Sequence, residues 1–212
     1  MNPAKKLLGI EIGAPARDPG TWRELVDDCA RCVSPLRQPL ERAGVTDPGL
    51  LGLCDTAGTA ALLTGLWRDV RVDVFKEGRV YIPRDIAERH GLDLALMVKA
   101  VKLDTDRGCD GNQRTGTCDC ALLPHAGMLS VRKPYRAAME ELVKRTDRMF
   151  LKSRAAWAGL PPVLRRSYRR LTYQGRATLG TIARHNYDTL TRRLTPNGLQ
   201  RAWIGIRLKL PG

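Results

Sequence analysis

The feature that most constrains the fold is a helical pattern over residues 46–75, TDPGLLGLCDTAGTAALLTGLWRDVRVDVF. Thr46 or Asp47 can cap its start, and Pro48 suits its first turn. Its apolar side chains recur at helical spacing, at Leu51, Cys54, Ala57 or Gly58, Ala61, Leu62 and Leu66. Gly58 and Gly65 each weaken such a helix by roughly 1 kcal/mol relative to alanine. They also allow another helix or a ligand to approach closely.

Helical patterns continue through most of the chain. A capping box at Thr21 and Glu24 predicts a helix start. Further helices are expected over 83–91, over 93–103, from Tyr135 to about Arg154, and over 161–194 as one helix or a broken pair. Strand alternation is nowhere sustained, so the fold class is all-α. We expect a loose arm over 1–20 and one domain over 21–212, with a polar, glycine-rich loop insertion at 104–134.

Composition narrows the function classes. The chain has 212 residues and a net charge of +14, and residues 131–212 carry 19 Lys/Arg against 4 Asp/Glu. Such a field suits nucleic acid, an anionic membrane surface, a phosphorylated ligand or simply a solvated helix face. We expect no apolar run long enough to span a bilayer and no signal-peptide core before the domain. The cytoplasm is therefore expected, with reduced cysteines and a peripheral place at the membrane as an option.

Asp69 and Asp73 lie four residues apart, so a helix would project both carboxylates from one face. Their repulsion calls for a cation, and Mg²⁺ suits because it uses one or two carboxylates plus water and substrate phosphate. Arg68, Arg71, Lys76 and Arg79 are near enough in sequence to bind a phosphate. The alternative is a solvated face whose Asp/Arg pairs contribute little.

The segment GTAALLTGLWRDVRVDVFKEGRVYIPRDIAERHGL, residues 58–92, resembles the second aspartate-rich block of the squalene/phytoene synthase family. That block is a helix ending in D-x-x-x-D, followed by a G-R-x-Y-x-P turn. The D-V-x-V-D form is similar to bacterial squalene and hydroxysqualene synthases of hopanoid pathways. CARCVSPL at 29–36 and the Tyr-Asp pair at 187–188 resemble other family segments, so the resemblance covers about residues 21–195.

The resemblance implies a terpenoid-synthase-type helical bundle that joins two prenyl diphosphates head to head. Asp69 and Asp73 match the metal-binding and catalytic aspartates, whereas Arg68, Arg79 and Tyr81 match positions that contact diphosphate or close the site. The implied cofactor is Mg²⁺, with NADPH only if squalene is the product. The implied substrate is farnesyl or geranylgeranyl diphosphate.

The chain departs from the family pattern in three ways. Only 68 residues precede Asp69, and the family's first aspartate-rich block is not among them, so we expect an N-terminally incomplete bundle. Leu62 and Gly65 replace the family's glutamine and asparagine, and Ser34 and Arg37 replace an asparagine and a glycine. These departures imply reduced activity of the isolated chain, a complementing family subunit, or a non-catalytic relative that binds a partner or a membrane surface.

Other residues have ordinary explanations beside functional ones. Cys109, Cys118, Cys120 and His125 have ligand chemistry for zinc, but their spacing is not that of a standard finger, and free thiols in a loop are the alternative. His90 is expected to interact with a helix C-terminus. The aromatic residues among the C-terminal arginines are expected to pack in the core, and no nucleic-acid module is present, so nucleic acid is not an expected partner.

Overall fold

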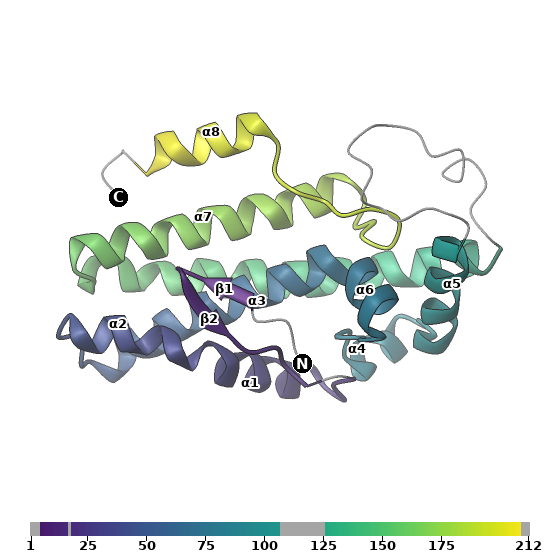
Figure 1. The fold of residues 1–212 in the computed structure, drawn as a ribbon, viewed down its shortest axis with the longest axis horizontal. Coiled ribbons are helices and arrows are strands. Elements are labelled where there is room, and N and C mark those ends of the chain that lie inside the picture. The colour runs from purple at the N-terminus through teal and green to yellow at the C-terminus, as the bar shows by residue number, and fades with distance from the viewer. Residues whose placement is uncertain (1–4, 17, 107–125, 209–212) are drawn as a thin grey trace.

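A computed structural model describes residues 5–16, 18–106 and 126–208 as a helical bundle (Figure 1). The long helical pattern forms α3 (Pro48–Glu77), and α1, α5, α6 and α7 pack against it. The all-α prediction is confirmed. The other helices are α1 (Trp22–Val33), α2 (Arg37–Arg42), α4 (Arg84–Arg89), α5 (Leu94–Asp106), α6 (Ala126–Ser153), α7 (Pro162–Arg184) and α8 (Gly198–Arg207), with 3-10 turns η1 (Ser34–Leu36) and η3 (Arg154–Gly159).

Local signals explain where α3 begins and ends. The Asp47 carboxylate accepts a 2.6 Å hydrogen bond from the backbone N–H of Leu50, and Pro48 occupies the first turn. At the other end Gly78 adopts φ 59°, a left-handed conformation that glycine adopts at little cost. These caps place Asp69 and Asp73 in the last turns of one continuous helix. The predicted capping box of α1 at Thr21 and Glu24 is also present.

The described residues form two hydrophobic clusters, a large one around the C-terminal half of α3 and a smaller one around its N-terminal half. In the large cluster, Trp67 is fully buried, stacks on Trp22 at 6.5 Å between ring centroids, and donates a 2.9 Å hydrogen bond to Thr146 on α6. Because the indole N–H has a partner, this hydrogen bond offsets the cost of removing it from water. This packing holds the aspartate-bearing turns of α3 rigidly against α6.

Helix α3 is long and apolar enough to cross a membrane by length and composition, which the sequence reading did not anticipate. Half of its most apolar window is buried inside the bundle. Its buried positions include Asp69, Arg71 and Asp73. The apolar composition of α3 is therefore accounted for by its place at the centre of the bundle.

Three local expectations differ from the structure. Residues 5–12, expected within a loose arm, form an antiparallel hairpin of β1 (Lys5–Leu7) and β2 (Ile10–Ile12), whose Ile12 is buried. Helix α6 begins at Ala126, so residues 126–134 are helical and not part of the predicted insertion. Pro134 lies inside α6 because the buried side chains that follow, Tyr135, Ala138, Met139 and Leu142, hold the helix against the core.

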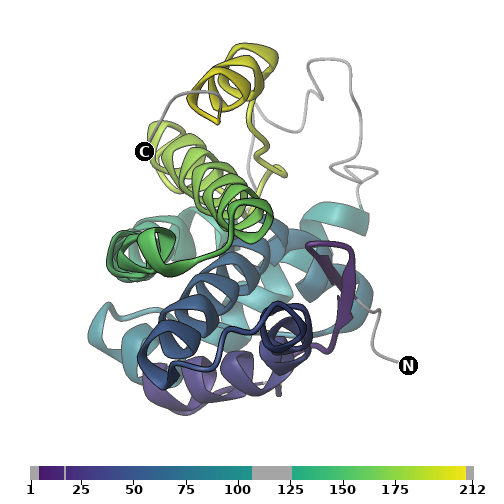
Figure 2. The same cartoon turned by 90° about the vertical axis from the view of Figure 1, so that its left-hand side faces the viewer.

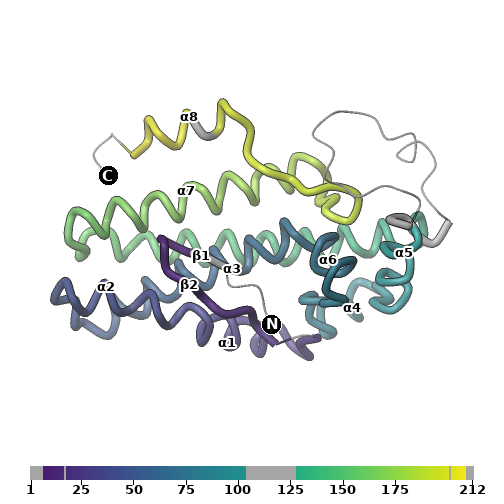
Figure 3. The backbone as a smooth tube through the Cα atoms, viewed as in Figure 1, coloured from purple at the N-terminus to yellow at the C-terminus, as the bar shows by residue number. Residues whose placement is uncertain are grey.

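The third difference is α8, which follows a non-helical segment at 185–197. Figure 3 shows the backbone turning at the end of α7 and running back along it as α8. The predicted helix or broken pair over 161–194 is thus one helix, α7, followed by irregular chain. Cys109, Cys118, Cys120 and His125, considered above as zinc ligands, lie outside the described residues.

Candidate functional site

The aspartate pair lies on a buried face of α3. Asp69 is 8% exposed and Asp73 is 7% exposed, so neither is on the solvated helix face that was the alternative interpretation. Residues four apart on a helix have Cβ atoms about 6 Å from each other. Two acids this close and this buried require nearby positive charge, which the structure supplies as arginines.

Two arginines bind Asp69. Arg68 donates to both carboxylate oxygens, at 3.0 and 2.6 Å, and Arg193 donates from Nε to Oδ1 at 2.7 Å. Burial alone would raise the pKa of Asp69, but the hydrogen bonds and charges of Arg68 and Arg193 outweigh it, so the pKa lies below its ordinary value. Asp69 is therefore ionised at neutral pH. Arg68 was predicted from the sequence as a site residue, whereas Arg193 was not.

The turn after α3 gathers the other predicted residues beside Asp73. Arg79 forms an ion pair with Glu77 at 2.5 Å, and its backbone N–H bonds the carbonyl oxygen of Asp73 at 3.0 Å. Burial raises the pKa of the Tyr81 hydroxyl, a hydrogen bond with Arg79 opposes this, and the carboxylates of Asp73 and Glu77 raise it further. The structure thus brings Arg79 and Tyr81 to the Asp73 end of the pair.

The segment 185–197 closes one side of this region. Asn186 and Tyr187 have φ of 52° and 58°, two consecutive left-handed residues that turn the chain sharply after α7. Arg71 then donates a 2.9 Å hydrogen bond to the carbonyl of Leu190, and the Tyr135 hydroxyl meets Thr189 at 2.5 Å. These contacts anchor the segment to α3 and α6, and so bring Arg193 to Asp69.

A further acid lies on the same segment. Asp188 is 3% exposed and accepts a 3.0 Å hydrogen bond from Arg132, with Arg136 at 3.8 Å. Both arginines come from α6, in the part that was predicted to be loop or helix start. The closing Tyr-Asp motif was noticed in the sequence, but its arginine partners were not, because nothing local in the sequence connects them.

One position of α3 next to Asp69 is not filled by packing. A Cβ atom added at Gly65, one turn before Asp69 on α3, would meet no atom within 4 Å. Leu62, another turn back, is instead part of the core. Gly65 and Leu62 stand where the family has amide side chains. The position of Gly65 is therefore open, whereas that of Leu62 is filled by core packing.

The carboxylates of the aspartate pair could supply part of the ligand set of a metal ion. In the described part of the chain no three His, Cys, Asp or Glu side chains gather in one place. Two carboxylates fit Mg²⁺, which completes its shell with water and phosphate oxygens, but not a closed protein site. Asp69 would have to exchange at least one arginine for the ion. The residues therefore fit the carboxylate part of a metal–diphosphate site.

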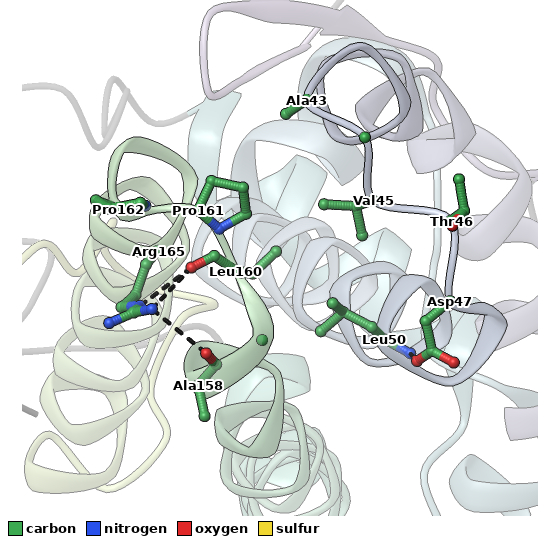
Figure 4. Close-up of a pocket in the computed structure, with 12 residues that line it drawn as sticks. Ala43, Val45, Thr46, Asp47, Leu50, Ala158, Leu160, Pro161, Pro162 and Arg165 are labelled. Atoms are coloured by element: carbon green, nitrogen blue, oxygen red, sulfur yellow. Dashed lines mark hydrogen bonds between the residues drawn. The ribbon is translucent and has the colours of Figure 1, made fainter.

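A cavity lies elsewhere in the described part of the chain, with a volume of about 500 Å³. Figure 4 shows its lining residues, which come from the chain before α3 and the chain before α7. Its lining includes Val45, Asp47, Leu50 and Arg165, and Arg165 donates to the carbonyls of Leu160 and Ala158. At 1.5 Å per residue, Asp47 is about 30 Å along α3 from Asp69. This cavity is thus separate from the aspartate pair.

Comparisons with known proteins agree with this geometry. Residues 15–108, which include the aspartate pair and its turn, match the model of the family "Squalene/phytoene synthase". A phytoene synthase from Cereibacter sphaeroides is 28% identical over 208 residues, covering 96% of this chain and 50% of that protein. Over residues 15–108 the chain is similar to the squalene/phytoene synthase family.

A solved structure shares the family fold. The crystal structure of squalene synthase HpnC from Alicyclobacillus acidocaldarius matches 86% of this chain and 56% of that one, with a TM-score of 0.62 and 22% identity. At 22% identity this match shows a shared fold and nothing further. The chain spans about half the length of both relatives.

One family position is used differently here. Arg37, which stands where the family segment has glycine, forms an ion pair with Asp55 on the N-terminal half of α3. Asp55 lies about 20 Å along α3 from Asp69, so this ion pair joins α2 to α3 without touching the aspartate pair.

Proposed function

We propose that the chain is a prenyltransferase-family protein whose Asp69–Asp73 pair binds a prenyl diphosphate together with Mg²⁺. The observation that carries this proposal is the buried pair itself, with arginines from α3, from the turn after it and from segment 185–197 beside it. Burying two like charges is costly unless a counter-charge is present. A buried pair of carboxylates is therefore suited to a site that binds a metal cation together with a phosphate group.

Each residue has a distinct role in this proposal. Asp69 and Asp73 would hold the metal, and bound Mg²⁺ would neutralise the charge that develops on the diphosphate leaving group. Arg68 and Arg193, which are part-exposed, would turn from Asp69 toward the phosphate oxygens, where charge-assisted hydrogen bonds are strong. Tyr81 and Arg79 would close the Asp73 end and limit the access of water.

The reaction that we propose is head-to-head condensation of farnesyl or geranylgeranyl diphosphate, giving presqualene diphosphate or squalene-type products in terpenoid biosynthesis. NADPH would be needed only if squalene is the product. Because the described residues offer two metal-binding carboxylates, we propose that a complementing family subunit supplies further ligands for turnover.

A second candidate is a non-catalytic family member that serves as a partner or binds a membrane surface. The ion pairs around Asp69 favour it, since Arg68 and Arg193 already neutralise the carboxylate without a metal. In this case the arginines keep their present contacts, and the diphosphate site is not used.

Photoaffinity labelling separates the two candidates. A diazirine-bearing farnesyl diphosphate analogue is irradiated with the chain, with and without Mg²⁺, and labelled peptides are mapped by mass spectrometry. We expect Mg²⁺-dependent labels on α3, α6 or segment 185–197, lost in the Asp69→Asn/Asp73→Asn variant. Asp55→Asn is the matched control, because Asp55 is also an ion-paired acid on α3. Labelling that is indifferent to Mg²⁺ and to the double change would favour the non-catalytic candidate.

A further inference from the structure

Helix α8 presents an apolar face to solvent. Leu199, Trp203 and Ile206 are 83%, 49% and 60% exposed. Their spacing of four and three residues places them on one side of the helix. Isolated apolar residues on a surface are ordinary, but three large ones aligned on a ten-residue helix form a continuous stripe.

The stripe is held in place and is not a frayed end. Asn197 and Gln200 form a capping box at the start of α8, and Thr181 on α7 contacts Gln200 at 3.2 Å. At the other end Arg169 on α7 donates a 3.0 Å hydrogen bond to the carbonyl of Arg207. Figures 1 and 2 show α8 lying along α7 as a ridge at the edge of the bundle.

The aromatic side chains next to α8 fix the orientation of the stripe. Trp203 meets Tyr173 on α7 edge to face at 6.2 Å, and Tyr173 meets Trp157 at 5.7 Å. Ile204, on the other side of α8, is buried. One edge of the Trp203 ring is thus packed while the rest remains exposed, which is the amphipathic placement of tryptophan at membrane interfaces.

Positive charge surrounds the stripe. Residues 189–212 include five Lys/Arg and no Asp/Glu. Arg184 and Arg207 are exposed, and the Arg207 guanidinium lies 4.9 Å from the Trp203 ring centroid. Beside α8, a shallow groove of about 600 Å³ is lined by Ala177, Gly180, Arg184, Leu199, Gln200 and Trp203.

We propose that α8 and its rim of arginines bind the interface of an anionic lipid bilayer. The helix would lie in the plane of the surface, with Leu199 and Ile206 in the acyl boundary and Trp203 at headgroup depth. The exposed arginines would contact lipid phosphates. A bilayer is favoured over an acidic protein because the stripe combines large exposed apolar side chains with neighbouring arginines, which together match acyl chains and lipid phosphates.

This inference gives a surface to the membrane-binding candidate above, and it does not depend on the prenyltransferase proposal, because it uses neither the aspartate pair nor a prenyl diphosphate. Vesicle flotation of the whole chain tests it directly. The vesicles are phosphatidylcholine alone, or phosphatidylcholine with phosphatidylglycerol, each at low and high salt. We expect binding to the anionic vesicles that falls as salt rises, because charge attraction is screened.

Three variants locate the surface. Leu199→Gln/Ile206→Gln should lower the binding constant for anionic vesicles by about tenfold or more, because two exposed side chains lose their apolar contact. Arg184→Gln/Arg207→Gln should lower it by about tenfold at low salt and little at high salt. Leu129→Gln is the control, since Leu129 is a 56% exposed leucine on α6, and it should bind like wild type.

Four results would overturn the proposal. They are equal binding to neutral and anionic vesicles, no binding to either, unchanged binding by the Leu199/Ile206 variant, and self-association through α8. Sedimentation velocity without vesicles tests the last. A dimer that dissociates on Leu199→Gln/Ile206→Gln would show that a second copy covers the stripe.

Discussion

The contact between Asp69 and Arg193 joins α3 to segment 185–197 and can be weighed by a double-mutant cycle. The Asp69 carboxylate accepts three hydrogen bonds from two guanidinium groups. A net contribution of about 1.5–3 kcal/mol is usual for a hydrogen bond to a charged group. The side chains of Arg68 and Arg193 are 32% and 47% exposed, so water can replace part of what they lose.

We therefore expect Asp69→Asn to lower the free energy of unfolding by about 2 kcal/mol and Arg193→Gln by about 1 kcal/mol. The double variant should cost less than the sum, with a coupling energy of about 1 kcal/mol. Urea unfolding followed by circular dichroism at about pH 7 provides all four values.

The pH dependence follows from the lowered pKa of Asp69. A carboxyl whose pKa is lower in the folded chain stabilises the fold fully above its unfolded pKa of about 4. That contribution is lost as pH falls through the folded pKa. The difference between wild type and Asp69→Asn should be the same at about pH 7 and pH 5 and should shrink near pH 3.

The opposite outcome would refute this reasoning. If Asp69→Asn is as stable as wild type or more stable, the carboxylate is held at a cost to the fold, as in a ligand site. If Arg193→Gln costs the same in both backgrounds, the 2.7 Å contact contributes nothing to stability.

Further predictions concern packing, charge and activity. Gly175→Ala should destabilise by about 2–3 kcal/mol, because its Cβ would lie 2.2 Å from Phe150 Cζ, whereas Gly180→Ala on the same helix meets open space and should be neutral or stabilising in urea unfolding. Glu141→Gln should lower stability at neutral pH, and the loss should shrink below about pH 4, because hydrogen bonds with His90 and Arg145 outweigh burial and lower the pKa of Glu141; an unchanged pH profile of unfolding would contradict this. The isolated chain with farnesyl diphosphate, Mg²⁺ and NADPH should form little or no squalene, hydroxysqualene or presqualene diphosphate by chromatography, and robust product would show that two carboxylates are enough.

The sequence predicted what depends on local spacing. The start of α3 followed from Asp47 and Pro48, and the shared face of Asp69 and Asp73 followed from the helical period. His90 was expected at a helix end and lies at the C-cap of α4, where its ring also bonds Glu141 on α6 at 2.7 Å. That partner was not predictable from spacing, because it comes from a distant helix.

Contacts between residues far apart in the chain could not be predicted from the sequence. Arg193 reaches Asp69 only because Arg71 and Tyr135 anchor segment 185–197 to the bundle. Pro134 was read as the boundary of a helix, since proline disfavours helix interiors, but tertiary packing overrides this preference in α6. The hairpin at 5–12 and helix α8 are short, and short elements carry too few periodic positions to be recognised.

The central claim is that Asp69 and Asp73 bind a metal and a prenyl diphosphate together, and calorimetry tests it most directly. A non-hydrolysable farnesyl diphosphate analogue is titrated into the chain with and without Mg²⁺. Two carboxylates alone make a weak, largely hydrated Mg²⁺ site, and the diphosphate needs the counter-charge of the metal. We predict that binding requires Mg²⁺, disappears in Asp69→Asn/Asp73→Asn while helix content stays the same, and persists in Asp55→Asn. If Mg²⁺ makes no difference to wild type, or the double variant binds like wild type, the aspartates serve only the ion pairs seen in the structure.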